Sequence, residues 1–382
     1  METTDNHLTK KIKRCSSADR ISNLPSDIID NILTCLPIKE AVKTSVLSKK
    51  WRFKWRYLSK LVFDNTFYQI PGHLFPEKRS KPFFDMYKVL LLHRGPIFHF
   101  SLWIHKLEIY PEINQLMLYL SEKDVREIML RGYYFDIVPS FLFSCVTLRS
   151  LTLHSCKFKV PPAFQGFVKL VSLSFERVDF KTDLFETFIS KCPLLKRLSL
   201  VGCTKTGQPY EPTKLLESAP MIEHLHLGSG YVDFLQYGTL WRKLSLGSLK
   251  VLELPRVYIV CTDHVSSVLN LIVSSPNLEK LDIGFVTIMD GIQALASELL
   301  KVQDLLDNAL KKLRMVKLEL SDTKEVKPDL EFIKFILAES VVLEKMYIEP
   351  AHGTVAEDGL QILKEIVRLQ RSSKKAEILY LD

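Results

Sequence analysis

The amino-acid sequence predicts an α/β protein in which a small segment of three short helices precedes a long solenoid of strand-and-helix repeats. Apolar residues recur at helical spacing between residues 19 and 64. From about residue 102 onward, an apolar-x-x-apolar-x-apolar motif recurs along the chain. The 382 residues are 47% hydrophobic and 25% charged, a balance that allows a large buried core. We therefore expect a chain that is globular over most of its length.

The three helices of the N-terminal segment are delimited by caps and prolines. Ser26 or Asp27 is suited to cap the first helix, and Pro37 should end it. A second helix is predicted over residues 39–47, and Ser48 should cap a third. Such a trio is close to the lower size limit for independent folding, so its surplus apolar side chains need a cover, either from the rest of the chain or from another protein.

The positive charge of the chain is concentrated in this segment. The net charge is +8, and the stretch Lys39–Lys60 holds eight cationic residues against the single acid Glu40. A local basic face fits an acidic protein partner as well as it fits phosphate, and the rest of the chain is nearly neutral. We expect a protein partner here and no nucleic acid.

Three landmarks of the segment resemble an F-box: Leu24-Pro25 at its start, the Leu36-Pro37 break, and the run Val46-Leu47-Ser48-Lys49-Lys50-Trp51. The resemblance implies a surface completed by a Skp-type adaptor, which connects F-box proteins to a cullin and its ubiquitin-transfer machinery. Lysines stand at 49 and 50 where the family often has arginine, and lysine lacks the bidentate fork. The candidate adaptor-binding residues are Leu24, Pro25, Ile28, Ile29, Leu36, Pro37, Val42, Leu47, Ser48 and Trp51.

The repeated motif is typical of leucine-rich repeats. Its central residue recurs in steps of 21 to 29 residues, at positions 107, 128, 151, 173, 198, 225, 252 and 281, with looser copies at 315–320 and 343–348. Side chains alternate along a strand, so the anchors enter a shared core and the residues beside them face outward on an open sheet. The candidate target-binding residues at these outward positions are Arg197, Ser199, Val201, His224, His226, Val251, Glu253, Lys280 and Asp282.

Further runs extend the resemblance over nearly the whole chain. They are Leu92-His93-Arg94-Gly95-Pro96-Ile97, Lys191-Cys192-Pro193-Leu194-Leu195 and residues 330–346. With the F-box and repeats, they are similar to plant F-box/LRR proteins that end in an FBD-type segment. We accordingly expect a basic leader at 1–18, the F-box at 19–64, a helical linker and solenoid cap at 65–101, leucine-rich repeats at 102–320 and an FBD-like α/β region at 321–382.

The resemblance implies the substrate-recognition subunit of an SCF-type cullin-RING ubiquitin ligase, which contributes proximity and not catalysis. Two alternatives stay open: a ligase-independent scaffold that binds proteins through its repeats, and a co-receptor that needs a small ligand. The target would be a protein, and we expect no cofactor and no enzymatic activity, because no catalytic or phosphate-binding motif is present.

Several single residues suggest other chemistry that we consider less favoured. The seven cysteines are scattered and contain no C-x-x-C pair, so we expect reduced thiols in the cytoplasm or nucleus. The richest apolar stretch, residues 89–104, is interrupted by charged residues, glycine and proline, so we expect no signal peptide or membrane span. Cys156 and Cys203 are expected to be structural. His224 and His226 share a strand face as two metal ligands would, but a third ligand is missing, so an exposed recognition pair is expected. The run Lys10–Arg14 is either a nuclear import signal or a charged leader.

Overall fold

The computed structural model describes residues 20–68, 80–103, 112–206, 212–228, 244–259, 262–287, 309–321, 327–351 and 356–381. The chain divides into two compact units, the first ending at Pro96 and the second beginning at Ile97. The predicted leader at 1–18 and the first predicted repeat, at 104–109, lie outside the described residues.

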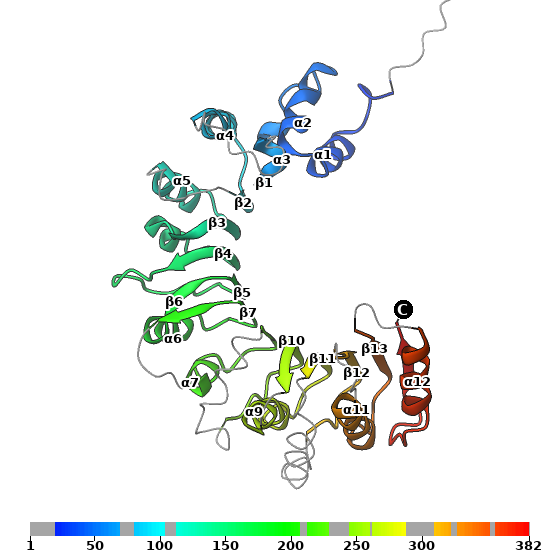
Figure 1. The fold of residues 1–382 in the computed structure, drawn as a ribbon. Coiled ribbons are helices and arrows are strands. Elements are labelled where there is room, and N and C mark those ends of the chain that lie inside the picture. The colour runs from blue at the N-terminus through cyan, green and yellow to red at the C-terminus, as the bar shows by residue number, and fades with distance from the viewer. Residues whose placement is uncertain are drawn as a thin grey trace, which may run out of the picture. The chain divides into compact units, whose positions relative to one another are not determined.

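The first unit is mainly helical (Figure 1). Its elements are α1 (Ser26–Thr34), α2 (Ile38–Lys43), the 3₁₀ helices η1 (Thr44–Val46) and η2 (Lys54–Tyr57), β1 (Lys60–Phe63), α3 (Asn65–Tyr68) and α4 (Ser80–Leu92). Its core is built from apolar side chains on α1, α2 and the following turns, among them Leu33, Ile38 and Ala41.

The caps predicted for these helices are wrong. The residue before α1 is Pro25, with φ −53° and ψ 148°, and no side chain caps the helix. Pro37 occupies the same place before α2, with φ −55° and ψ 143°. Each proline has an extended ψ, and its carbonyl accepts the first hydrogen bond of the helix, from Ile29 N–H at 3.1 Å and from Ala41 N–H at 2.9 Å. Ser48 does not begin a third α-helix either, because the chain there forms turns that lead into η2.

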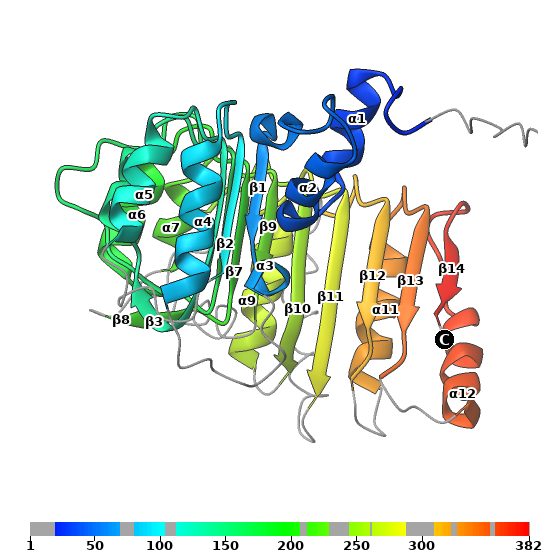
Figure 2. The same cartoon turned by 90° about the horizontal axis from the view of Figure 1, so that it is seen from above.

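The second unit is built on one parallel sheet. Its strands are β2 (His99–Trp103), β3 (Glu127–Ile137), β4 (Ser150–Phe158), β5 (Ser172–Glu176), β6 (Asp179–Lys181), β7 (Arg197–Val201), β8 (Thr204–Thr206), β9 (His224–Leu227), β10 (Val251–Ile259), β11 (Lys280–Thr287), β12 (Met315–Glu319), β13 (Lys345–Glu349) and β14 (Glu377–Tyr380). From β2 to β14 they follow chain order, except that β6 and β8 pair beside the main sheet. Figure 2 shows β10 to β13 side by side and running in the same direction.

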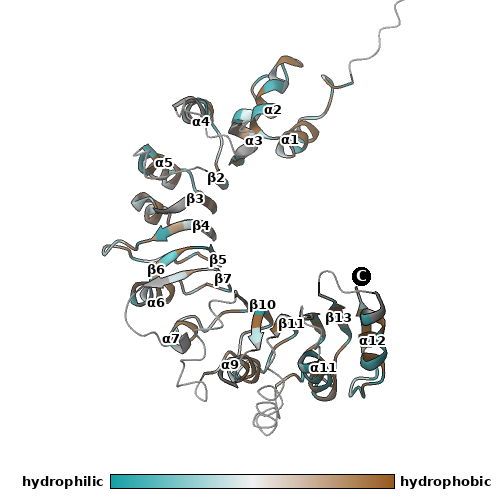
Figure 3. Cartoon of the chain, viewed as in Figure 1, coloured by the Kyte–Doolittle hydropathy of each residue, from teal (hydrophilic) through white to brown (hydrophobic). Residues whose placement is uncertain are grey.

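The helices of the second unit lie on one face of this sheet (Figure 1). They are α5 (Glu112–Ser121), the 3₁₀ helix η4 (Ser140–Ser144), α6 (Thr182–Ser190), α7 (Pro212–Glu217), α9 (Thr262–Val273), α11 (Lys327–Glu339) and α12 (Ala356–Val367). Each of α11 and α12 carries both hydrophilic and hydrophobic residues (Figure 3), as expected for a helix with one face against a sheet. Within the described residues, no helix is both long and apolar enough to span a membrane.

Strand pairing confirms the predicted repeats. Their central anchors are aligned across the sheet and buried: Phe100, Ile128, Leu151, Leu173, Leu198, Leu225, Leu252, Leu281, Val316 and Met346. The strand before Ile128 is centred on Phe100, seven positions earlier than the predicted centre at 107. Ile97, Phe100 and Leu102 match the repeat motif themselves, so the motif occurs twice in close succession and the earlier copy forms the strand.

Phenylalanines fill the core between the sheet and α6. The rings of Phe180 and Phe185 have centroids 4.3 Å apart, and the Phe158 ring lies 4.8 Å from Phe175 and 4.9 Å from Phe188. Tilted and edge-on ring pairs at such distances add to the free energy gained from apolar burial. These aromatic side chains fill the space between the sheet and its helices. The polar side chains lie on the other face of the sheet.

The C-terminal region, predicted as FBD-like from residue 321, continues the same sheet. Strands β12, β13 and β14 pair in parallel with matched register. α11 connects β12 to β13 in sequence, and α12 connects β13 to β14. The open face of the sheet therefore extends into this region.

Candidate functional site

The ten residues predicted to bind an adaptor differ widely in exposure. Pro25, Ile28, Pro37 and Leu47 are exposed, Leu24, Leu36, Val42 and Ser48 are half-buried, and Ile29 and Trp51 are buried. The Trp51 indole N–H donates to the Ile21 carbonyl at 3.1 Å. Ile29 and Trp51 are therefore core residues of the first unit, and they support the surface from beneath instead of forming part of it.

Sequence reasoning missed exposed apolar residues of the same unit. Val46, at the end of η1, is 88% exposed, and Phe53 and Tyr57 are each more than half exposed. Val46 stands next to Leu47, so the pair presents branched aliphatic side chains to solvent without cover. The sequence predicts an α-helix over residues 39–47, whereas residues 44–46 form a 3₁₀ helix, so helical spacing did not identify Val46 as exposed.

Part of the basic stretch is neutralised within the unit. The Lys54 ammonium lies 3.0 Å from an Asp30 carboxylate oxygen, and that of Lys43 lies 2.7 Å from Glu40. The Lys50 ammonium donates to the Leu24 carbonyl. Lys49 and Arg52 are exposed and form no ion pair within the described part of the chain. These two cations remain available to an acidic partner.

The open face of the second unit carries three rows of outward side chains. The first row precedes the central anchors and includes Arg197, His224, Val251 and Lys280; the second row follows them and includes Ser199, His226, Glu253 and Asp282. The third row lies two residues further and includes Arg131, His154, Glu176 and Val201. The structure thus brings together all nine residues predicted to bind a target, on the adjacent strands β7, β9, β10 and β11.

Glu253 forms ion pairs with three others of the nine, which gives an ionic network centred on its carboxylate. The Glu253 carboxylate lies 3.2 Å from His224 Nε2, 3.7 Å from His226 Nδ1 and 3.4 Å from the Lys280 ammonium. Burial alone would raise the pKa of Glu253, but its interactions with the nearby His224 and with the Lys280 charge outweigh burial and lower that pKa. Burial lowers the pKa of His226, although Glu253 opposes this shift. Near neutral pH, the lowered pKa values favour a neutral His226 and an ionised Glu253 in this network.

Arg197 and Asp282 stand at the two sides of this network. Arg197 is exposed, and Asp282 lies 3.8 Å from the Lys280 ammonium. Burial raises the pKa of Asp282. Beyond it, the Lys317 ammonium lies 2.9 Å from Glu349, and this hydrogen bond raises the pKa of Lys317. Alternating charges thus continue across β11 to β13.

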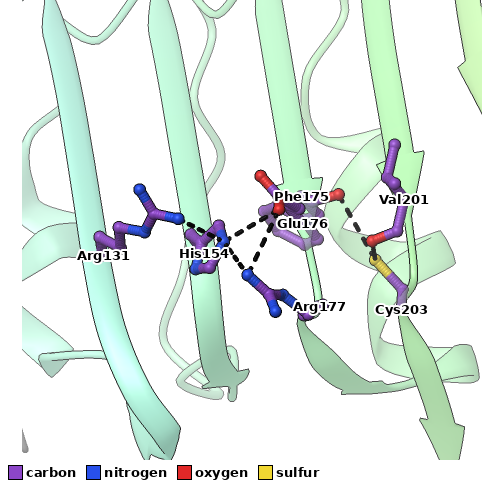
Figure 4. Close-up of polar contacts among 7 residues, drawn as sticks. All are labelled: Arg131, His154, Phe175, Glu176, Arg177, Val201 and Cys203. Atoms are coloured by element: carbon purple, nitrogen blue, oxygen red, sulfur yellow. Dashed lines mark hydrogen bonds and ion pairs between the residues drawn. The ribbon is translucent and has the colours of Figure 1, made fainter. Parts of the chain in front are cut away.

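A second cluster lies on the third row and was not predicted (Figure 4). His154 Nε2 is 2.7 Å from Arg177 Nη2, 3.2 Å from Arg131 Nη2 and 2.9 Å from Glu176 Oε1. The Arg131 guanidinium also lies over the Trp103 ring, 4.1 Å from its centroid. Burial lowers the pKa of His154, so its imidazole is neutral at pH 7. Only the strand register, which aligns residues 131, 154 and 176, would have revealed this cluster.

Four of the described cysteines, Cys145, Cys156, Cys192 and Cys203, lie within or beside the repeat core, whereas Cys35 is exposed on the first unit. Cys156 is buried, and the Cys203 thiol contacts the Phe175 carbonyl at 3.5 Å (Figure 4). Burial raises the pKa of Cys145 to about 12 and that of Cys192 to about 11, so both stay protonated at neutral pH. Among the described residues, no group of three or more histidine, cysteine, aspartate or glutamate side chains is arranged to hold a metal ion.

Family comparisons match both units. The F-box domain family matches residues 21–63, and the family described as "FBD-associated F-box protein At5g56370, LRR repeats" matches residues 113–211. The F-box/FBD/LRR-repeat protein At1g13570 of Arabidopsis thaliana is 31% identical over 426 aligned residues, covering 96% of this chain and 99% of that protein. The putative FBD-associated F-box protein At5g56690 of the same plant is 33% identical over 187 residues, 47% of this chain and 46% of that protein.

A solved structure is similar in a more general way. An internalin (inlF) from Listeria monocytogenes aligns with 74% of this chain and 82% of its own, at a TM-score of 0.33 and 13% identity. The helical module and the repeat sheet define a protein with an F-box and leucine-rich repeats. The chain belongs to the F-box/FBD/LRR-repeat protein family.

Proposed function

We propose that this chain is the substrate-recognition subunit of an SCF-type cullin-RING ubiquitin ligase, acting in the cytoplasm, the nucleus or both. Its first unit binds a Skp-type adaptor, and through the adaptor a cullin. The open face of its repeats binds the protein to be modified. The subunit itself performs no chemistry, since it acts by holding a target close to the ubiquitin carrier.

The observation that carries the proposal is the uncovered apolar pair at the end of η1. Val46 is 88% exposed and Leu47 is 47% exposed, while Ile28 and Pro37 on the same unit are exposed as well. Adjacent exposed aliphatic side chains are unfavourable in water and are typical of a docking surface. Lys49 and Arg52, which form no ion pair among the described residues, lie two and five positions after Leu47 and suit an acidic adaptor, because complementary charge accelerates association.

The open face of the sheet supports the second half of the proposal. Its outward side chains are mixed in charge, with Arg197, the histidines and Glu253 on adjacent strands. Lys280 and Asp282 lie close together on the next strand. Such a mixed polar strip suits a protein surface better than the uniformly negative backbone of a nucleic acid.

The decisive experiment compares adaptor binding by two charge-insertion variants of the full-length chain. In the test variant, Val46→Asp and Leu47→Asp place carboxylates on the proposed docking surface. In the control variant, Val146→Asp and Val168→Asp do the same at residues that are 56% and 55% exposed on the second unit. Binding of a purified Skp-type adaptor is measured by calorimetry. Each buried aliphatic anchor contributes on the order of 1 to 3 kcal/mol, so the test variant should bind at least about thirtyfold more weakly.

The control variant should retain wild-type affinity within about twofold, since exposed substitutions away from an interface have small effects. Wild-type affinity in the Val46→Asp/Leu47→Asp variant would refute the proposed docking surface. A wild-type chain that binds no Skp-type adaptor would refute the ligase assignment and favour a scaffold that binds proteins through its repeats alone.

A further inference from the structure

Three successive repeats share an unusual backbone conformation just after their third-row residue. Ser155, Arg177 and Gly202 follow His154, Glu176 and Val201, and have φ of 52°, 52° and 59°. Glycine adopts this left-handed conformation freely, whereas a residue with a side chain loses about 1 to 2 kcal/mol there. Arginine at position 177 therefore lowers the stability of the folded state relative to glycine at this φ.

The conformation of Arg177 places its guanidinium in the third-row cluster. Arg177 Nη2 lies 2.7 Å from His154 Nε2 and 3.6 Å from Glu176 Oε1. Arg131 reaches the same imidazole nitrogen from the neighbouring strand, at 3.2 Å (Figure 4). Gly202 gives the Arg177 side chain its space, because a Cβ at 202 would lie 3.3 Å from Arg177 Cγ. Two guanidinium groups thus converge on one histidine.

The acceptors in the cluster are too few for these donors. A neutral imidazole has one N–H and one lone pair. His154 Nε2 therefore either donates a hydrogen bond to Glu176 or accepts one from an arginine, but not both. Each guanidinium carries five N–H groups, and Glu176 is the single carboxylate in contact with the cluster in the described chain. His154 is only 7% exposed, and its Nδ1 is buried without a hydrogen-bond partner among the described residues. The cluster has two cations against one anion.

The surface beside the cluster carries short polar side chains that do not obstruct an extended peptide. Thr152, Ser174 and Ser199 occupy the second row on β4, β5 and β7 in direct register. Their side chains are short and half-buried, and their hydroxyls are able to bond a peptide backbone. Met129, next to Thr152 in the same row, is 42% exposed and bounds this stretch with an apolar side chain.

We propose that this cluster anchors an acidic segment of the target protein, with one aspartate or glutamate carboxylate held between the guanidinium groups of Arg131 and Arg177. The inference rests on the proposed function and specifies its target-binding site. A single carboxylate matches the one missing negative charge and the planar guanidinium fork. A phosphate group carries about −1.5 to −2 at pH 7 and would leave net negative charge beside Glu176.

The test uses synthetic heptapeptide arrays with random flanks and glutamate, glutamine or phosphoserine fixed at the centre. They are probed with the labelled full-length chain, and affinities of the best glutamate peptides and their glutamine twins are measured by fluorescence polarisation. The wild type should bind glutamate peptides about tenfold more tightly than their glutamine twins, a difference typical of one charge-assisted hydrogen-bonding group. Arg131→Gln and Arg177→Gly should each abolish most of this preference.

Controls separate a specific anchor from general charge and from misfolding. Arg149→Gln removes the same charge from an exposed site just before β4 and should leave the preference intact. Arg177→Gly should have a denaturation midpoint at or above that of the wild type, because glycine suits the positive φ. All three variants should bind the adaptor normally.

Each contrary result overturns the inference without affecting the adaptor-binding proposal. These results are equal binding of glutamate and glutamine peptides by the wild type, a preference for phosphoserine, an equal loss in Arg149→Gln, and an unchanged preference in Arg131→Gln and Arg177→Gly. Failure of the adaptor to bind the wild-type chain would instead contradict the proposed function, whatever the peptides show.

Discussion

Single residues on the open face act through their neighbours. Glu253 is shared by two histidines and a lysine, and His154 is shared by two arginines and Glu176. Substituting one member of such a group changes the protonation and position of the others, so effects of single variants should not be additive. Charge at these positions depends on pH through His226 and His154, whose pKa burial lowers from an ordinary value close to neutrality.

Acidification should weaken the folded state through His226 and His154. Burial lowers the pKa of both side chains below the ordinary value, so the unfolded chain takes up protons first as the pH falls. Their stabilisation is present above about pH 6.5 and is lost progressively below it. The free energy of unfolding, measured in urea from pH 7.5 to 5.5, should fall, and His226→Gln should make that fall smaller. A stability that stays constant or rises over this range, or a variant with the wild-type slope, would contradict the assigned shifts.

Sequence reasoning at this scale identified which side chains face outward, because alternation along a strand fixes that property. It grouped His224, His226 and Glu253 on one surface, but not their joint ion pairs. It missed Arg131 and Arg177, whose proximity depends on pairing between strands of different repeats and on a positive φ at Arg177. It also placed Ile29 and Trp51 on the adaptor surface, where burial makes them core residues.

At the scale of elements, the sheet holds its register across an irregular pair of strands. Between Leu254 and Val257, β10 has one more residue than β11, and Gly284 stands opposite this bulge. A Cβ on Gly284 would lie 2.4 Å from the Pro255 carbonyl oxygen, which is far inside van der Waals contact. The absence of a side chain at 284 therefore allows the two backbones to approach each other closely.

Gly284→Ala should destabilise the chain by about 1 to 3 kcal/mol, because backbone atoms must move to accept the methyl group. Gly247→Ala is the matched control, since a Cβ there meets nothing within 4 Å, and its effect should stay within about 1 kcal/mol or be slightly stabilising. Urea denaturation followed by circular dichroism measures both. Equal stability of the two variants would show that the bulge adapts without cost.

The elements were predictable to different degrees. Repeat strands follow from a strong local pattern, and the structure confirms their order and anchors. The repeat motif matches the sequence twice in close succession, centred on Phe100 and on Leu107. Local pattern alone does not show which of the two matches forms the strand that pairs with β3, and this strand contains Phe100. The second N-terminal helix was predicted to reach residue 47, but α2 ends at Lys43 and a 3₁₀ turn follows. The third predicted helix is replaced by turns and η2, where Trp51 donates to the Ile21 carbonyl and Trp55 is buried. Tertiary contacts of this kind override the local propensity for α-helix.

At the scale of the whole molecule, the proposed function assigns one task to each of the two units. The first unit exposes apolar side chains that need a cover, and the second exposes charged and polar rows on an open sheet. Under this proposal, adaptor binding and target binding are expected to be energetically independent, because the residues that carry them belong to different units.

Hydrogen–deuterium exchange of the full-length chain, with and without a Skp-type adaptor, tests this division most directly. Adaptor binding should slow exchange in peptides covering α1, α2 and residues 44–57 of the first unit, and should leave β7 to β12 of the second unit unchanged. The Val46→Asp/Leu47→Asp variant should lose this protection. Unchanged exchange in the first unit at saturating adaptor, or protection located on the open sheet face, would contradict the assignment of the first unit as the adaptor-binding module.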